Sequence, residues 1–67
     1  MVIYDDLWKL LKERNISLYS LIKDYKISPG QITRLKRNQY VSTHTLEVFC
    51  EILNCQIGDI AKYLPNK

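Results

Sequence analysis

Apolar residues recur at helical spacing along the whole sequence, and no other feature restricts the possible folds as strongly. Tyr4, Leu7, Trp8 and Leu11, for example, follow the i, i+3, i+4, i+7 pattern that puts side chains on one face of a helix. Asn15 suits the end of this helix, because asparagine tolerates the left-handed turn that follows a helix. No segment shows the sustained two-residue alternation of a half-buried strand. The pattern therefore predicts an all-α fold.

The clearest helix start is the run Ser28-Pro29-Gly30-Gln31. Ser28 suits the N-cap, and Pro29 suits the first helical position, where its missing N–H is not needed. Gln31 lies three residues after the cap and can complete a capping box.

This helix is expected to span residues 29–37. Its only apolar residues are Ile32 and Leu35. It should therefore be anchored along a narrow seam and leave most of its surface free.

Three further helices are expected around it. A second helix begins at its cap, Ser17, and its inner face should carry Leu18, Leu21, Ile22 and Tyr25. A fourth helix begins at Ser42 and ends at Asn54, with a stripe of Leu46, Phe49, Cys50 and Leu53. A fifth should span residues 57–64 and end before Pro65. The prediction is a compact five-helix bundle that forms a single domain over residues 1–67.

Basic charge is concentrated in the middle of the chain. Between residues 25 and 46 there is no acidic residue, and this segment contributes +4 to a net charge of +3. The four bases are Lys26, Arg34, Lys36 and Arg37. Such a distribution favours a polyanionic partner, although a solvated basic surface would look the same.

Other functional classes find little support. A hydrophobic fraction of 46% is far from that of disordered chains, and no apolar run is long enough to span a membrane. The N-terminus lacks the basic start of a signal peptide, so a cytoplasmic protein is expected. Cys50 and Cys55 are too few for a disulfide scaffold or, even with His44 nearby, for a zinc site. We expect neither metal nor other cofactor, and the chain shows no catalytic set of an enzyme.

The second and third helices, joined by a turn at Tyr25-Lys26-Ile27, form a helix-turn-helix pattern. Leu21 and Ile22 are expected to pack on the apolar seam of the third helix, and Ile27 should fill the space beneath the turn. The third helix can then protrude as a ridge that fits the DNA major groove.

Residues 17–36, SLYSLIKDYKISPGQITRLK, resemble the phage Cro/repressor family of helix-turn-helix regulators, also called the Xre family. The resemblance extends over LWKLL at residues 7–11, over residues 42–53 and over NCQIGDI at residues 54–60. It thus covers the chain from about Tyr4 to Leu64. It implies sequence-specific binding of double-stranded DNA by a transcriptional regulator, a repressor, in the nucleoid of a bacterium or a phage host.

Three positions depart from the family pattern. Ile22 stands where the family often has alanine, and its larger side chain is expected to splay the two helices slightly. Lys26 stands where glycine is favoured in the turn, and a left-handed non-glycine residue costs on the order of 1 kcal/mol. Leu18 replaces a glutamine that grips a phosphate in many members, and leucine cannot do so.

Carried over position by position, the resemblance assigns base reading to Gln31, Thr33 and Arg34. Gln31 can pair with adenine and Arg34 with guanine, while the Thr33 methyl can meet a thymine methyl. Pro29 and Gly30 would allow close approach to the DNA. The competing interpretations are that Gln31 only caps its helix and that Arg34 is only a solvated charge.

A second group of residues is expected to meet the DNA backbone, which would give affinity and register without sequence choice. Its members are Ser17, Ser28, Lys36, Arg37, Asn38 and Tyr40. Tyr40 could instead cover the core between the third and fourth helices. Ser17, like Ser42 at the start of the fourth helix, could serve only as a helix cap.

The family also implies a homodimer on a two-fold symmetric operator, because one short helix contacts too few base pairs. The pairing surface could be the fifth helix with Tyr63 and Leu64, or the N-terminal Val2-Ile3. No small-molecule effector is evident. The alternative function is a protein-binding module of the same fold, antitoxin-like or an adaptor, that does not bind DNA.

Overall fold

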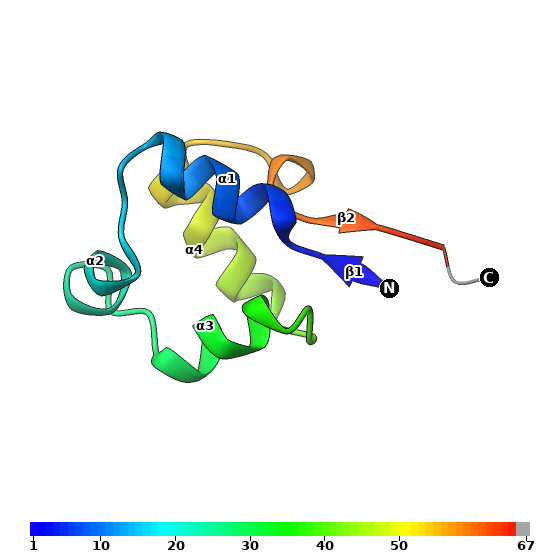
Figure 1. Ribbon diagram of the computed structural model, residues 1–67, viewed down its shortest axis with the longest axis horizontal. Coiled ribbons are helices and arrows are strands. Elements are labelled where there is room, and N and C mark those ends of the chain that lie inside the picture. The colour runs from blue at the N-terminus through cyan, green and yellow to red at the C-terminus, as the bar shows by residue number, and fades with distance from the viewer. Residues whose placement is uncertain (66–67) are drawn as a thin grey trace.

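The computed structural model describes residues 1–65 and shows a helical domain with a short pair of strands at one end (Figure 1). The helices in this part of the chain are α1 (Asp5–Glu13), α2 (Leu18–Lys23), α3 (Pro29–Lys36) and α4 (Thr43–Leu53), followed by the 3-10 helix η1 (Ile57–Asp59). The strands β1 (Val2–Ile3) and β2 (Lys62–Tyr63) pair antiparallel, with Val2 opposite Tyr63 and Ile3 opposite Lys62.

The predicted helical class is confirmed within residues 1–65 apart from one short pair of strands, but the expected fifth helix is wrong. Only the single turn of η1 forms, and the chain then runs extended beside the N-terminus, where the Leu64 N–H donates to the Met1 carbonyl at 2.7 Å. Ile60 is fully buried, but Ile57 and Leu64 are each about half exposed. One buried anchor does not hold a helix against the core, whereas pairing with β1 satisfies the backbone groups of this segment.

Serine hydroxyls begin three of the helices, as predicted. The Oγ atoms of Ser17, Ser28 and Ser42 accept the backbone N–H three residues on, at 3.0, 3.3 and 3.2 Å. Each bond satisfies one N–H that has no partner inside its helix, and such a cap stabilises a helix by about 1 kcal/mol.

A left-handed residue follows each of the four α-helices. The four are Asn15, Lys26, Asn38 and Asn54, with φ between 51° and 61°. The predicted stops at Asn15 and Asn54 and the left-handed turn at Lys26 are confirmed. Serine caps at helix starts and left-handed residues after helix ends divide the chain into short helices, and the chain changes direction at every junction.

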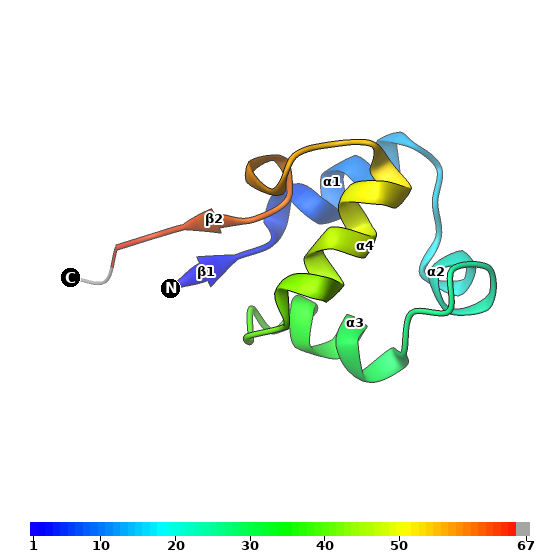
Figure 2. The same cartoon turned by 180° about the vertical axis from the view of Figure 1, so that it is seen from behind.

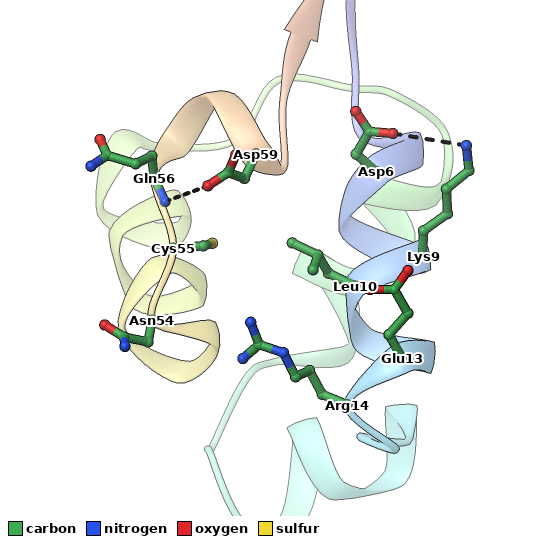
Figure 3. A pocket seen from close by; sticks show the side chains of 9 residues that line it. All are labelled: Asp6, Lys9, Leu10, Glu13, Arg14, Asn54, Cys55, Gln56 and Asp59. Carbon is green, nitrogen blue, oxygen red and sulfur yellow. Dashed lines mark hydrogen bonds and ion pairs between the residues drawn. The ribbon is translucent and has the colours of Figure 1, made fainter.

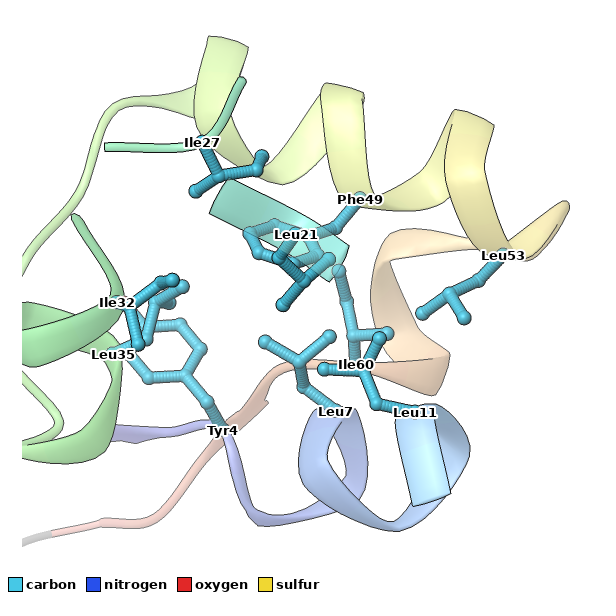
Figure 4. Close-up of a cluster of buried hydrophobic side chains, with 10 residues drawn as sticks. All are labelled: Tyr4, Leu7, Leu11, Leu21, Ile27, Ile32, Leu35, Phe49, Leu53 and Ile60. Atoms are coloured by element: carbon cyan, nitrogen blue, oxygen red, sulfur yellow. The ribbon is translucent and has the colours of Figure 1, made fainter. Parts of the chain in front are cut away.

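The core lies where the four α-helices and η1 converge, and Figure 4 shows its side chains pointing toward one another. The buried apolar residues are Tyr4, Leu7, Leu11, Leu21, Ile27, Ile32, Leu35, Phe49, Leu53 and Ile60. Burying a side chain of this size stabilises the fold by about 1.5–3 kcal/mol relative to exposure. The cluster confirms that Leu21 and Ile27 pack with the two aliphatic anchors of α3.

The prediction for the inner face of α2 is partly wrong. Leu21 is fully buried and Leu18 half-buried, but Ile22 is 40% exposed and Tyr25 43%. A helix turns by about 100° per residue, so Ile22 lies well to the side of Leu21. With six residues, α2 is held by Leu21 and by the turn that follows, and Ile22 is not wedged between α2 and α3.

The longest helix among residues 1–65, α4, has 11 residues, and none in that part has the length and apolar content needed to cross a bilayer.

Candidate nucleic-acid interface

The helix α3 lies along the outer edge of the domain, and only two of its side chains are buried (Figures 1 and 2). Ile32 and Leu35 enter the core, as the sequence predicted. Every other residue of α3 is exposed except Gln31, which is half-buried. The helix is thus fixed from below by two aliphatic anchors, and its outer face is open to solvent.

The basic residues of this edge have no acidic partners in the part of the chain that the structure describes. Arg34, Lys36 and Arg37 are exposed, and none of the ion pairs formed within residues 1–65 involves them. Their charges are therefore not neutralised locally. An unpaired cluster of two guanidinium groups and an ammonium group attracts anions, and guanidinium also donates two parallel hydrogen bonds.

Gln31 does not close the capping box that its position suggested. The Gln31 N–H donates to Ser28 Oγ at 3.3 Å, but the side-chain Oε1 is buried and accepts no hydrogen bond from any described residue. The side chain lines a cavity of about 370 Å³ beside His44 and Thr45 at the start of α4. In this conformation its carbonyl oxygen is not available to a ligand on the outer face.

Thr33 bonds to its own helix. Its hydroxyl donates to the Pro29 carbonyl at 3.1 Å, one turn earlier, while the residue remains exposed. With the hydroxyl engaged, the methyl group is the part of this side chain that is free for an external contact. The geometry suits an apolar contact better than a hydrogen bond.

The helix itself does not require a glycine at Gly30. The backbone there has no positive φ, and a Cβ added at this position would meet nothing within 4 Å. Its N–H is the free donor of the first turn, because Pro29 has no N–H and that of Gln31 is bound to Ser28. The bare backbone at the start of α3 can therefore be approached closely from outside.

Asn38 has a structural role that the sequence did not reveal. Its Oδ1 accepts the Tyr4 N–H at 3.1 Å and so joins the end of α3 to the start of α1. The Tyr4 hydroxyl donates to the Gln39 carbonyl at 3.2 Å, and burial raises the pKa of Tyr4, with a smaller contribution from Tyr40. No sequence motif marks this link, because it joins residues 34 positions apart.

Tyr40 and His44 are surface residues. Tyr40 is 83% exposed, so the alternative in which it covers the core between the third and fourth helices is wrong. His44 is exposed, and its Nδ1 lies 3.5 Å from a Glu47 carboxylate oxygen. Tyr40 remains available beside the basic edge of α3.

Leu18 contributes to an apolar groove instead of the polar contact of the family pattern. With Trp8, Leu11 and Ile16 it lines a cavity of about 590 Å³ between α1 and α2, which has Lys36 at its rim. Ser17 and Ser28, at the starts of their helices, are exposed, and both hydroxyls act as caps.

The arrangement of α2, the turn around Lys26 and the solvent-facing α3 defines a helix-turn-helix protein. The chain belongs to the family of Cro/C1-type helix-turn-helix DNA-binding domains, whose family model matches residues 6–66. The resemblance inferred from the sequence is thereby confirmed.

A solved structure extends the comparison. The chain is similar to the crystal structure of the transcriptional regulator VanUg, Form II, with a TM-score of 0.86 and 38% sequence identity. The similarity covers 97% of this chain and 87% of that one. A comparison with curated proteins found no significant match.

Proposed function

We propose that this chain is a sequence-specific transcriptional repressor that inserts α3 into the major groove of double-stranded DNA. The observation that carries the proposal is the open face of α3, where Arg34 and its basic neighbours stand without acidic partners on a helix pinned by Ile32 and Leu35. The family and the similarity to a transcriptional regulator support it. In this proposal residues 1–67 act as one DNA-binding domain. The protein works in the cytoplasm.

Arg34 is the principal base-reading residue in this proposal. It is exposed and unpaired, and its guanidinium suits the two acceptors of guanine, a pair that contributes roughly 1–3 kcal/mol of discrimination. The Thr33 methyl meets a thymine methyl. Gln31 reads adenine only after its side chain rotates out of the cavity beside α4, and the unsatisfied Oε1 favours that rotation once a donor is offered.

The remaining site residues position the DNA without reading it. Pro29 and Gly30 allow the DNA to come close to the backbone at the start of α3. Lys36, Arg37 and Tyr40 meet phosphates from the far end, and the Nδ2 group of Asn38 can join them while Oδ1 holds Tyr4. The backbones at Ser17 and Ser28 complete the phosphate contacts at the two helix starts.

We also propose that the chain binds a two-fold symmetric operator as a homodimer, with half-sites one helical turn apart. The two surfaces considered from the sequence, the N-terminus and the segment of Tyr63 and Leu64, prove to be neighbours, because Val2 pairs with Tyr63. Tyr63 is 69% exposed and Leu64 47%. In this proposal the two alternatives become one dimer interface, the outer surface of the β1–β2 pair.

A protein-binding module is the competing function, and one observation favours it. Tyr19 and Ile22 on α2 and Tyr25 in the turn after it lie at intervals of three residues, and all are exposed. Such a row could meet a partner protein. This row has no cluster of basic side chains comparable with that on α3, so DNA remains the proposed partner.

Selection of bound sequences from a random DNA pool tests the proposal directly. A two-fold symmetric consensus is expected from the wild-type chain. Arg34→Ala should abolish the preference at one base pair in each half-site, whereas Arg37→Ala should weaken specific and random DNA alike and flatten the salt dependence. Lys9→Ala, on the exposed side of α1, is the matched control and should change neither. Recovery of no consensus, with salt-insensitive binding, would contradict the proposal.

A further inference from the structure

The only two cysteines of the sequence meet at the C-terminal cap of α4. Cys50 and Cys55 are both free and half-buried. The Cys55 N–H donates to the Cys50 carbonyl at 3.1 Å, and Asn54 between them is left-handed. This six-residue closure is the hydrogen bond of a Schellman cap, a motif that brings the side chains of its first and last residues together.

The backbone geometry fits a disulfide. The bond lengths along the path through the N–H···O bond limit the separation of the two Cα atoms to about 7.3 Å, and any bend in this path shortens it. Disulfides usually have Cα separations of about 4.4–6.8 Å. Both side chains line the same cavity at this end of α4. The cap thus holds the two residues side by side, at about the backbone separation that a disulfide between them requires.

Small reagents can reach the pair from solvent. Cys55 lines a cavity of about 560 Å³ between α1 and η1, and Figure 3 shows its sulfur pointing into that space toward Leu10. Cys50 and Cys55 together line a second cavity of about 540 Å³ beside His44 and Glu47. Cys55 lines both of these cavities and Cys50 only the second, so an oxidant has more access to Cys55. Burial and the neighbouring Cys55 raise the pKa of Cys50, which favours its thiol form.

We propose that Cys50 and Cys55 form a dithiol site that closes into an intrachain disulfide when the protein meets hydrogen peroxide. The Cys55 sulfur attacks one peroxide oxygen and becomes a sulfenic acid, with release of water. The Cys50 sulfur then attacks the Cys55 sulfur and displaces a second water. In total the peroxide gains two electrons and two protons, and the two thiols lose them. The resting protein is the dithiol.

The closed disulfide stabilises the corner between α4 and η1 and leaves the reading helix unchanged. The pair lies at the end of α4 that faces α1 and η1, whereas α3 packs near the other end (Figure 1). The chain after Cys55 leads through η1 into β2, so the disulfide also restrains the segment that pairs with β1. The inference does not depend on DNA binding.

Equilibration of the whole chain with glutathione redox buffers tests the proposal. A bond that suits the folded geometry must form more readily in the native chain than in the same chain unfolded in urea. We expect an equilibrium constant about tenfold higher in the native protein, and a correspondingly higher melting temperature of the oxidised form. The product should be a monomer lighter by two hydrogens. An equal or smaller constant in the native state, or covalent dimers as the main product, would overturn the proposal.

Phenylarsine oxide gives a second readout that needs no oxidation, because trivalent arsenic bridges two neighbouring thiols and releases one water. The native wild-type chain should bind one equivalent and thereby lose both free thiols. Cys50→Ser and Cys55→Ser, each shown by circular dichroism to be folded, should lose tight binding. Retention of full arsenical affinity by either variant would refute the pairing of these two residues.

Discussion

The backbone N–H of Tyr4 donates to the Asn38 side chain at 3.1 Å, so the residue that begins α1 is held by the turn that ends α3. This bond fixes the end of the proposed reading helix to the body of the domain. It also gives Asn38 two tasks, since the same residue adopts the left-handed conformation that ends α3.

Replacement of Asn38 should therefore separate two contributions to stability. Asn38→Gly removes only the bond to the part-buried Tyr4 N–H, and we expect a loss of about 1 kcal/mol in the free energy of unfolding. Asn38→Ala also introduces left-handed strain and should lose about 1 kcal/mol more. Urea titrations measure both. Equal stability of the two variants would show that the left-handed turn is not strained.

Gly30→Ala should stabilise the free protein and impair DNA binding. The added methyl group meets no atom of the chain, and alanine is favoured over glycine in a helix, so we expect a gain of about 0.5 kcal/mol. Under the proposed binding mode the same methyl group obstructs close approach and weakens specific binding. Thermal unfolding and a DNA titration on one sample check this, with Gly58→Ala, which also has open space, as the control. A more stable variant with unchanged affinity would exclude close approach at Gly30.

Gln31→Met should stabilise the protein by about 1 kcal/mol, because it replaces a buried carbonyl oxygen that has no partner with an apolar group of similar size. Under the proposed binding mode the preference for adenine at one position is lost. Gln39→Met, at an exposed position, is the control for the chemical change. A loss of stability in the Gln31 variant would mean that Oε1 has a partner in solution.

Lys26→Gly should raise stability by about 0.5 kcal/mol. Lys26 has a φ of 61°, and glycine relieves the strain of that conformation, although it adds freedom to the unfolded chain. The matched control is Lys12→Gly, at an exposed helical position, which should lower stability by about 1 kcal/mol. The same sign for both variants would contradict a strained turn.

The buried Tyr4 should make the protein sensitive to alkali. Burial raises the folded pKa of Tyr4 above its ordinary value, so above about pH 10 the unfolded chain loses this proton while the folded chain keeps it. The contribution is complete below that pH and is lost as the pH rises toward the folded pKa. Urea titrations from about pH 9 to about pH 11 should show stability falling with pH in the wild type. Tyr4→Phe should flatten this slope, whereas Tyr63→Phe, which is exposed, should not.

Local signals in the sequence were sufficient for the starts of α2, α3 and α4, for the ends of α1 and α4, and for the family. Ser17, Ser28 and Ser42 cap their helices, and Asn15 and Asn54 end theirs, because these effects act within one turn of the chain. Ile32 and Leu35 identified the buried seam of α3 for the same reason. The exposed basic edge followed from charge placement, and the named contacts to DNA remain proposals.

Long-range packing settled what those local signals left open. The spacing of residues 57–64 is compatible with a helix, but the β1 strand near the opposite end of the chain offers backbone partners, and the segment extends to meet them. Ile22 and Tyr25 match a helical stripe, yet too little of the core lies over α2 to cover them. Gln31 turns inward and Asn38 bonds to Tyr4 because of neighbours that sequence distance conceals. Periodicity reports which residues share a face, whereas burial depends on what the rest of the chain brings against that face.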